Sequence, residues 1–144
     1  MKNIYSNIFS FNKKILTKTV NSLKRGNLAS LPTETVYGLA GNAYSKRALR
    51  KIYKLKKRPT YNPVIIHYHN KQRAEKDVIL NDNFLKLYKK FCPGPITFIL
   101  RLKKKSKISK NVTNNKQTLA VRFPRHPLTR RLLKNMEYPL AAPS

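Results

Sequence analysis

The stretch that decides the fold runs through ten residues: Thr118-Leu119-Ala120-Val121-Arg122-Phe123-Pro124-Arg125-His126-Pro127. Its first six residues place Leu119, Val121 and Phe123 at alternate positions, which is typical of a half-buried strand over residues 118–123. Pro127 suits the first position of a helix, and the apolar spacing after it predicts a helix through Lys134. A strand that leads directly into a helix is the building unit of an α/β domain.

Alternation along this strand puts Thr118, Ala120 and Arg122 on one face. A guanidinium group in a half-buried strand needs an anionic partner. The chain has only five acidic residues, at 34, 75, 77, 82 and 137. We therefore expect a ligand carboxylate or phosphate to be the partner of Arg122.

Helices and strands alternate on both sides of this stretch. Hydrophobic periodicity, capping residues and turn residues predict a helix over 12–27, a strand over 28–31, a helix between Ser45 and Pro59, a strand over 64–68, a helix over 82–91, a strand over 96–102, a basic loop over 103–116 and a last strand starting at Leu140. This order predicts an α/β domain around a largely buried sheet.

Length and composition narrow the class of protein. The chain has 144 residues, of which 40% are hydrophobic, so it suits one domain with a real core. No apolar run approaches the roughly 20 residues of a membrane span, and the N-terminus shows no secretory signal. Cys92 is the single cysteine, which excludes an internal disulfide and a cysteine-based zinc cluster. We expect a cytoplasmic protein in which Cys92 is structural.

The charge balance is strongly basic, with 32 Lys and Arg against five acids and a formal net charge of +27. Such a charge favours nucleic acid or a nucleotide as partner. Since 22 of these cations are Lys, codon drift in an AT-rich genome explains the charge equally well, and both explanations stay open. The scattered acids argue against paired-carboxylate chemistry and an all-protein magnesium site. We expect no protein metal site, and any metal would arrive on a phosphate ligand.

Three further segments carry more polar residues than folding requires. Residues 31–39 put Glu34 in a turn between two threonines, although an ordinary capped turn explains the segment too. Lys56, Arg58 and Asn62 follow a helix and could hold a phosphate, or could form a solvated helix end. His67 lies in an apolar strand, where a satisfied core histidine is the alternative.

Six segments, taken in order, resemble the YrdC/Sua5 family of threonylcarbamoyl-AMP synthases. They are residues 32–39, 56–63, 67, 93–97, 120–127 and 139–144. The resemblance covers residues 12–144 and leaves 1–11 as an N-terminal lead-in. It implies a YrdC-like fold, which is a twisted mixed α/β sheet flanked by helices, with a basic concave face.

The resemblance also implies an activity. The family is a nucleotidyltransferase that condenses L-threonine, bicarbonate and ATP into L-threonylcarbamoyladenylate and releases pyrophosphate. The product serves the N6-threonylcarbamoyladenosine modification at position 37 of tRNA. The implied partners are therefore the three substrates, the tRNA threonylcarbamoyl-transfer machinery downstream, and tRNA or double-stranded RNA at the basic surface. Mg²⁺ would be carried on the ATP.

Residue roles follow from the same resemblance, position by position. Lys56 and Arg58 would be catalytic. The ATP-binding group would comprise Lys56, Arg58, Asn62, Thr118 and Ser144. The threonine-binding group would comprise Thr35, His67, Arg122 and the backbone of Ala142.

One departure concerns the end of the chain. The family motif continues as Ser-Ala-Asn, whereas this sequence stops at its first serine, Ser144. We therefore expect a domain that is incomplete at the C-terminus. This leaves two hypotheses: a threonylcarbamoyl-AMP synthase, or an inactive truncated remnant that acts only as a basic RNA-binding module.

Overall fold

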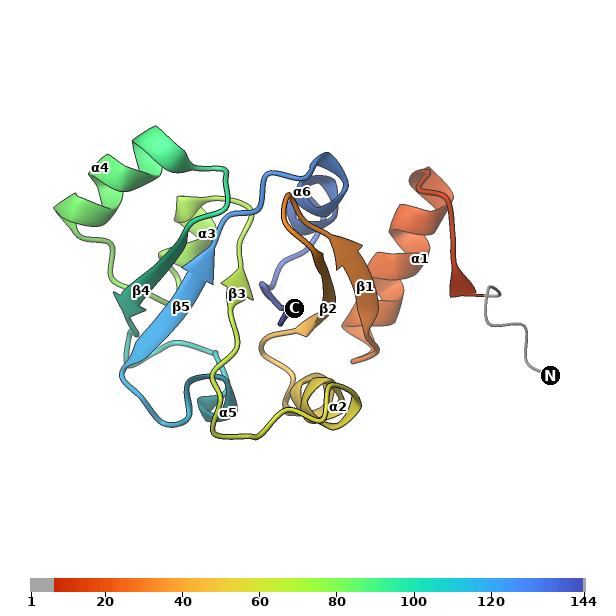
Figure 1. Cartoon of the computed structure of the whole chain (residues 1–144), viewed down its shortest axis with the longest axis horizontal. Helices are drawn as coiled ribbons and strands as arrows, with labels where there is room; N and C mark the ends of the chain where they lie inside the picture. Colours follow the sequence, from red (N-terminus) through yellow and green to blue (C-terminus); the bar gives the residue numbers. More distant parts are fainter. Residues whose placement is uncertain (1–6, 144) are drawn as a thin grey trace.

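A computed structural model describes residues 7–143 of the chain (Figure 1). Its elements, in order, are α1 (Lys13–Lys24), β1 (Ala29–Pro32), β2 (Tyr37–Asn42), α2 (Lys46–Leu55), β3 (Ile66–His67), α3 (Lys71–Ala74), α4 (Asp82–Phe91), β4 (Thr97–Arg101), α5 (Lys110–Thr113), β5 (Thr118–Arg122), α6 (Pro127–Lys134) and β6 (Leu140–Ala141). The strands form a six-stranded sheet in the order β1-β2-β6-β3-β5-β4. The expected α/β class with a mixed sheet is confirmed.

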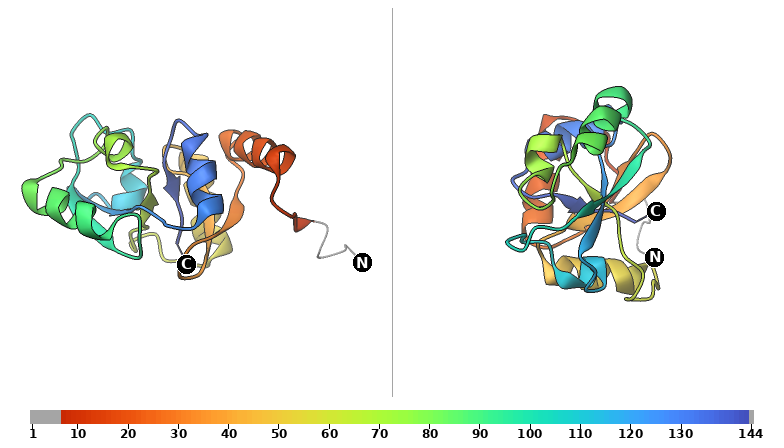
Figure 2. Two further views of the ribbon diagram at one scale, coloured as in Figure 1. Left: turned by 90° about the horizontal axis from the view of Figure 1, so that it is seen from above. Right: turned by 90° about the vertical axis from the view of Figure 1, so that its left-hand side faces the viewer.

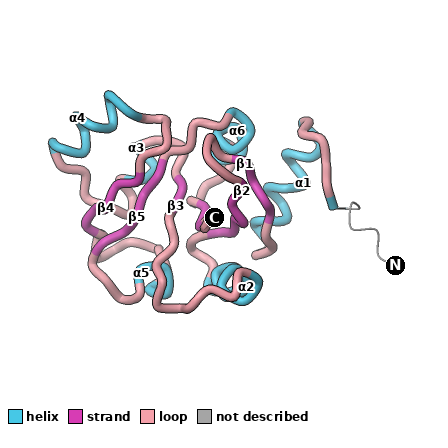
Figure 3. The backbone as a smooth tube through the Cα atoms, viewed as in Figure 1, coloured by secondary structure: helices cyan, strands magenta, loops and turns pink. Residues whose placement is uncertain are grey.

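The centre of the sheet joins segments that are far apart in sequence (Figure 3). Strand β3 pairs in parallel with β5, so that His67 lies opposite Arg122. Strand β6 fits between β2 and β3 and is antiparallel to both. The final residues of the described chain are thereby held between the first hairpin and the rest of the sheet.

One face of β4 and β5 packs into the core and the other stays open. Phe98 and Leu100 of β4 and Leu119 and Val121 of β5 are buried in the larger hydrophobic cluster. The intervening residues are at least partly exposed, as in Ile99, whose exposure is 66%. Helices α1, α3 and α6 lie behind the strands (Figure 2). The open face of β5 is the one that carries Thr118, Ala120 and Arg122.

Helices α1, α2, α4 and α6 begin within one residue of their predicted starts. The Asn12 side chain accepts a hydrogen bond from the Ile15 N–H at 2.9 Å, and Ser45 accepts one from the Ala48 N–H at 3.2 Å. Helix α6 begins at Pro127 as expected, and Gly26 adopts a φ of +76° just after α1. The longest described helix has 12 residues. Within residues 7–143 no helix is both long and apolar enough to cross a membrane.

Four elements differ from the sequence predictions. Helix α3 was not predicted, because its four residues are too few for a hydrophobic period. Strand β2 was not predicted, because its sequence, Tyr-Gly-Leu-Ala-Gly-Asn, has no β-branched residue and two glycines. The predicted loop 103–116 contains the short helix α5, whose Val112 is fully buried. The predicted strand 64–68 is paired only at residues 66–67, since the Val64 N–H donates instead to the Val112 carbonyl at 3.3 Å.

A buried carboxylate ties together the loops behind the sheet. Asp77 is 1% exposed, and its Oδ2 accepts from the Tyr44 and Tyr68 hydroxyls at 2.7 and 2.8 Å. Its Oδ1 accepts from the Ser106 hydroxyl at 2.6 Å and from the Lys107 N–H at 3.3 Å. Burial and the Asp77 charge raise the pKa of both tyrosines, which keeps them protonated as donors. One acid thus connects four segments of the chain.

We predict that Asp77→Ala lowers the free energy of unfolding by about 3 kcal/mol, because several buried donors lose their acceptor together. Urea denaturation followed by circular dichroism measures the change. Asp82→Ala is the matched control, since Asp82 is exposed in the first turn of α4 and its loss costs only a few tenths of a kcal/mol. Equal losses in the two variants would contradict this structural role of Asp77.

Candidate functional site

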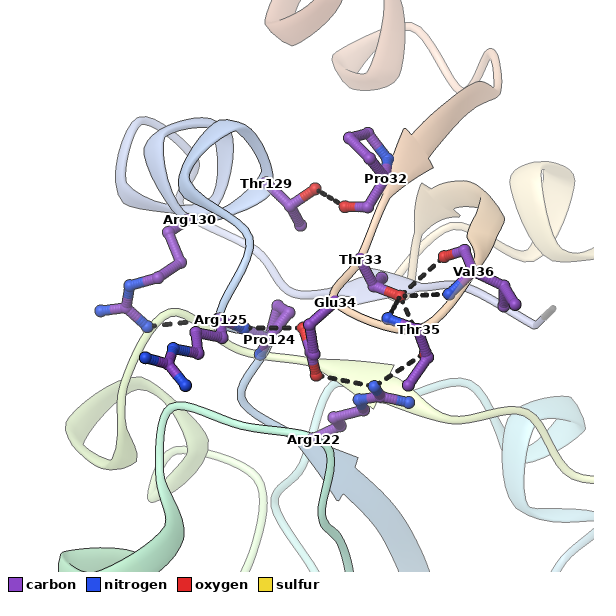
Figure 4. A network of polar contacts seen from close by, with 10 residues as sticks. All are labelled: Pro32, Thr33, Glu34, Thr35, Val36, Arg122, Pro124, Arg125, Thr129 and Arg130. Carbon is purple, nitrogen blue, oxygen red and sulfur yellow. Dashed lines mark hydrogen bonds and ion pairs between the residues drawn. The ribbon is translucent and has the colours of Figure 1, made fainter.

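The β1–β2 hairpin ends in a turn that its own side chains hold closed. The Thr33 hydroxyl donates to the Val36 carbonyl at 2.6 Å and accepts from the N–H groups of Thr35 and Val36 at 3.3 and 3.1 Å. These bonds fix residues 33–36 without help from Glu34 (Figure 4). The turn therefore presents the Glu34 and Thr35 side chains toward the end of β5.

Arg122 is held by this turn. Its Nη2 donates to Glu34 Oε1 at 2.7 Å and to Thr35 Oγ1 at 3.0 Å. The other carboxylate oxygen of Glu34 accepts from the Arg125 N–H at 2.9 Å. Arg122 and Glu34 are 13% and 15% exposed and form the one ion pair recorded among residues 7–143. Partial burial acts to raise the pKa of Glu34, but these hydrogen bonds and the Arg122 charge hold it below its ordinary value.

This pairing corrects the expectation that only a ligand would neutralise Arg122. In this structure the anion is Glu34, which lies 88 residues earlier in the sequence. Sequence analysis placed both residues in candidate segments and did not pair them. A count of acids could have indicated the pair. Glu34 is the only acidic residue within any of those segments, so it was the one acid there that could neutralise one of their cations.

Two buried polar atoms beside this pair have no hydrogen-bond partner. They are Arg122 Nε and Nδ1 of His67, which is 4% exposed on β3. Burial and the nearby Arg122 charge lower the pKa of His67 to about 4, so the imidazole is neutral at pH 7. Buried polar groups are normally satisfied. Two unsatisfied groups on neighbouring strand ends indicate a site for a small polar ligand.

Ala142 directly follows β6 and lies opposite Ile65, which is two residues before His67. Its N–H donates to the Ile65 carbonyl at 3.1 Å, which continues the β6 pairing. A Cβ atom at Gly38 would lie 3.3 Å from the Ala142 Cβ, so a side chain at position 38 would crowd this segment. The structure therefore brings Thr35 into contact with Arg122, places His67 on the adjacent strand, and puts Ala142 next to that strand.

The residues assigned to ATP occupy the loop after α2 and the start of β5. Arg58 donates from Nη2 to the Pro63 carbonyl at 2.9 Å and from Nε to the Asn62 carbonyl at 3.4 Å. Lys56 ends α2 and is exposed. The Tyr53 hydroxyl lies 3.0 Å from the Asn62 carbonyl and holds the loop against the core. Arg58 and Asn62 are thus brought together, with Lys56 close by in sequence.

Thr118 is separate from that loop. It begins β5, four residues before Arg122 on the same face, which corresponds to about 13 Å along a strand. No hydrogen bond between Thr118 and the loop is recorded among residues 7–143, and Ser144 lies outside the described residues. Of the candidate ATP group, Thr118 therefore lies at the opposite end of the open β5 face from Arg122, and the other described members lie in the loop after α2. In the described part of the chain, no cluster of three or more His, Cys, Asp or Glu could hold a metal ion.

Cys92 forms no recorded side-chain hydrogen bond among residues 7–143. It is the C-cap of α4, is half-buried and forms no disulfide. Burial raises the pKa of its thiol to about 11, so the nucleophilic thiolate is scarce at neutral pH. The structural role expected from the sequence is consistent with this environment.

Comparisons with known proteins agree on one family. The Sua5/YciO/YrdC family model, described as "Telomere recombination", matches residues 21–144. The threonylcarbamoyl-AMP synthase of Pyrococcus abyssi is 38% identical over 125 residues, covering 85% of this chain and 36% of the relative. That of Bacillus subtilis is 37% identical over 137 residues, covering 94% of this chain and 39% of the relative. The chain thus spans well under half the length of these two relatives.

Solved structures give the same result. P. abyssi Sua5 complexed with L-threonine superposes with a TM-score of 0.88 at 33% identity, covering 94% of this chain and 40% of that chain. Escherichia coli YciO superposes with a TM-score of 0.82 over 94% of this chain and 65% of that chain, and at 20% identity it supports the fold alone.

We predict that His67 makes stability depend on pH. Its folded pKa lies below the unfolded value of about 6.5, so its contribution is intact above pH 6.5 and is lost as the pH falls toward about 4. Across that interval the wild type should lose about 3 kcal/mol more than His67→Gln, which cannot titrate. Urea denaturation of both proteins from pH 7 to pH 4 measures the difference. Parallel stability curves would contradict the prediction.

Proposed function

Because the chain belongs to the Sua5/YciO/YrdC family, we propose that it makes L-threonylcarbamoyladenylate from L-threonine, bicarbonate and ATP for tRNA modification. The observation that carries the proposal is the cluster of polar side chains at the ends of β3 and β5. There a guanidinium group, a hydroxyl and a neutral imidazole converge, and two of their polar atoms have no partner. A relative 33% identical to this chain was solved with L-threonine, which supports the choice of amino acid.

Each functional group of threonine has a complementary group in this cluster. The carboxylate would pair with Arg122, since guanidinium groups bind carboxylates in a fixed two-point geometry. Thr35 and His67 provide a hydroxyl and a neutral ring nitrogen for the amine or the hydroxyl. The Ala142 backbone borders the site beside β3. A neutral His67 suits the task, because an imidazolium would repel a substrate ammonium group.

The reaction requires two bond-forming steps. The substrate ammonium group first loses a proton, and the resulting amine attacks the bicarbonate-derived carbon, forming a carbamate with loss of water. A carbamate oxygen then attacks the α-phosphorus of ATP, the bond to the bridging oxygen breaks, and pyrophosphate leaves. Both steps depend on positioning and on neutralising crowded negative charge. Lys56 and Arg58 would supply that charge as the catalytic residues.

The ATP would lie along the open strand face. Lys56, Arg58 and Asn62 would contact the phosphates, while Thr118 would contact the nucleotide at the start of β5. No acid neutralises Lys56 or Arg58 among residues 7–143, and Arg58 bonds only to backbone carbonyls, so the positive charge of both would be open to phosphates. Mg²⁺ would enter with the nucleotide.

A second candidate function rests on the charge. With a net charge of +27 and a single recorded ion pair in residues 7–143, the surface would attract RNA whether or not the site turns over. In that case the chain is a basic RNA-binding module, and tRNA is the natural ligand. Binding would weaken steeply with salt.

We predict that pyrophosphate release by the 144-residue chain requires ATP, threonine and bicarbonate together. Arg122→Ala and Arg58→Ala should each lower the rate about a hundredfold or more, because each leaves a substrate charge without its partner. Arg50→Ala, an exposed residue of α2, is the matched control and should keep the wild-type rate. The assay omits each substrate in turn.

The same three variants separate the two functions. If the chain only binds RNA, each arginine is one phosphate contact among many. Each substitution then reduces the slope of log RNA affinity against log salt concentration by about one unit. Two results together would contradict the synthase and support the RNA-binding module. The folded wild type would release no pyrophosphate, and all three variants would show equal small losses of tRNA affinity.

A further inference from the structure

The contact between Glu34 and Arg122 leaves one N–H donor of the guanidinium group without an acceptor. A guanidinium group binds a carboxylate best through two parallel N–H donors, and the Nε and Nη2 edge offers such a pair. Glu34 takes only Nη2, while Arg122 Nε is buried without an acceptor. The other oxygen of Glu34 does not reach Nε, since it accepts from the Arg125 N–H at 2.9 Å.

A free carboxylate is not tied in this way. It could accept from Nε and Nη2 together and satisfy the atom that Glu34 leaves unpaired. The exchange would replace one charge-assisted hydrogen bond by two. It would also restore the normal condition that buried donors have acceptors.

We propose that Glu34 occupies the position of the substrate carboxylate in the unliganded protein, and that threonine binds by displacing it from Arg122. This inference rests on the proposed function, because it takes threonine as the ligand of Arg122. It assigns Glu34 the role of an internal competitor that neutralises Arg122 until the substrate arrives.

The local structure allows this displacement at low cost. The 33–36 turn is closed by the Thr33 hydroxyl and does not depend on the Glu34 side chain. Glu34 can leave Arg122 and keep its bond to the Arg125 N–H. Only one side chain needs to move, and the β1–β2 hairpin stays paired.

Competition has a consequence for selectivity. An anion can reach Arg122 only if it binds better than the carboxylate already there. An amino-acid carboxylate with two-point geometry meets that condition. An anion that reaches only one N–H of Arg122 gains nothing over Glu34 and is at a disadvantage. Glu34 would thus reserve Arg122 for an anion that reaches both N–H groups.

The test is the affinity for L-threonine, measured by calorimetry on the full chain. In Glu34→Gln the competing charge is gone, so threonine should bind about three- to tenfold more tightly than to the wild type. Glu34→Asp, whose side chain is one methylene shorter and holds the carboxylate farther from Arg122, should also bind threonine more tightly than the wild type does. Glu137→Gln removes the same charge at an exposed position and should leave the affinity unchanged. Thermal unfolding verifies that each variant folds.

A threonine analogue isolates the group involved. Threoninol keeps the amine and the hydroxyl and replaces the carboxylate by an alcohol. Its affinity should not improve in Glu34→Gln, because it has no charge to place on Arg122. An equal gain for threonine and threoninol would show a nonspecific effect and overturn the competition.

The outcomes separate this inference from the proposed function. In one outcome the wild type binds threonine, and Glu34→Gln and Glu34→Asp bind it equally or more weakly. Glu34 is then a positioning residue; the competition is overturned, and the proposed function stands. Binding to the variants but not to the wild type supports it in its strongest form. If no folded protein in the series binds threonine, the threonine assignment fails and this inference fails with it.

Discussion

The position of Arg122 is the constraint on which the site depends. It ends the strand that pairs in parallel with β3, so its guanidinium group lies beside His67 and faces the turn between β1 and β2. A half-buried cation needs a counter-charge, and the chain has few acids to offer. The pairing with Glu34 meets this need and joins the first hairpin to the far half of the sheet, a contact that spans 88 residues of sequence.

The local part of the fold could be predicted from the sequence because its signals are local. Asn12, Ser45 and Pro127 mark helix starts through hydrogen bonds and backbone angles that involve three or four neighbouring residues. The alternation in β5 likewise gave the correct division into a buried and an open face. These features depend little on the rest of the molecule.

The rest depends on tertiary pairing. Strand β2 has weak strand propensity, and it forms because β1 on one side and β6 on the other supply its hydrogen bonds. Helix α5 lies in a basic segment and is held by the burial of Val112. The Glu34–Arg122 pair is of the same kind, since neither segment alone indicates that the other will lie within 2.7 Å.

The cations of the candidate site differ in whether an acidic residue neutralises them. At one end of β5 a cation is neutralised by Glu34, whereas Lys56 and Arg58, in the loop after α2, have no acidic partner among residues 7–143. Two substrates, one with a carboxylate and one with a triphosphate chain, would be sorted by that difference. The polyphosphate would be attracted to the cations that have no acidic partner, whereas a ligand carboxylate would offer Arg122 a second hydrogen bond that Glu34 does not make. A net charge of +27 attracts phosphates to many places on the surface. By neutralising Arg122, Glu34 reduces that attraction at one of them.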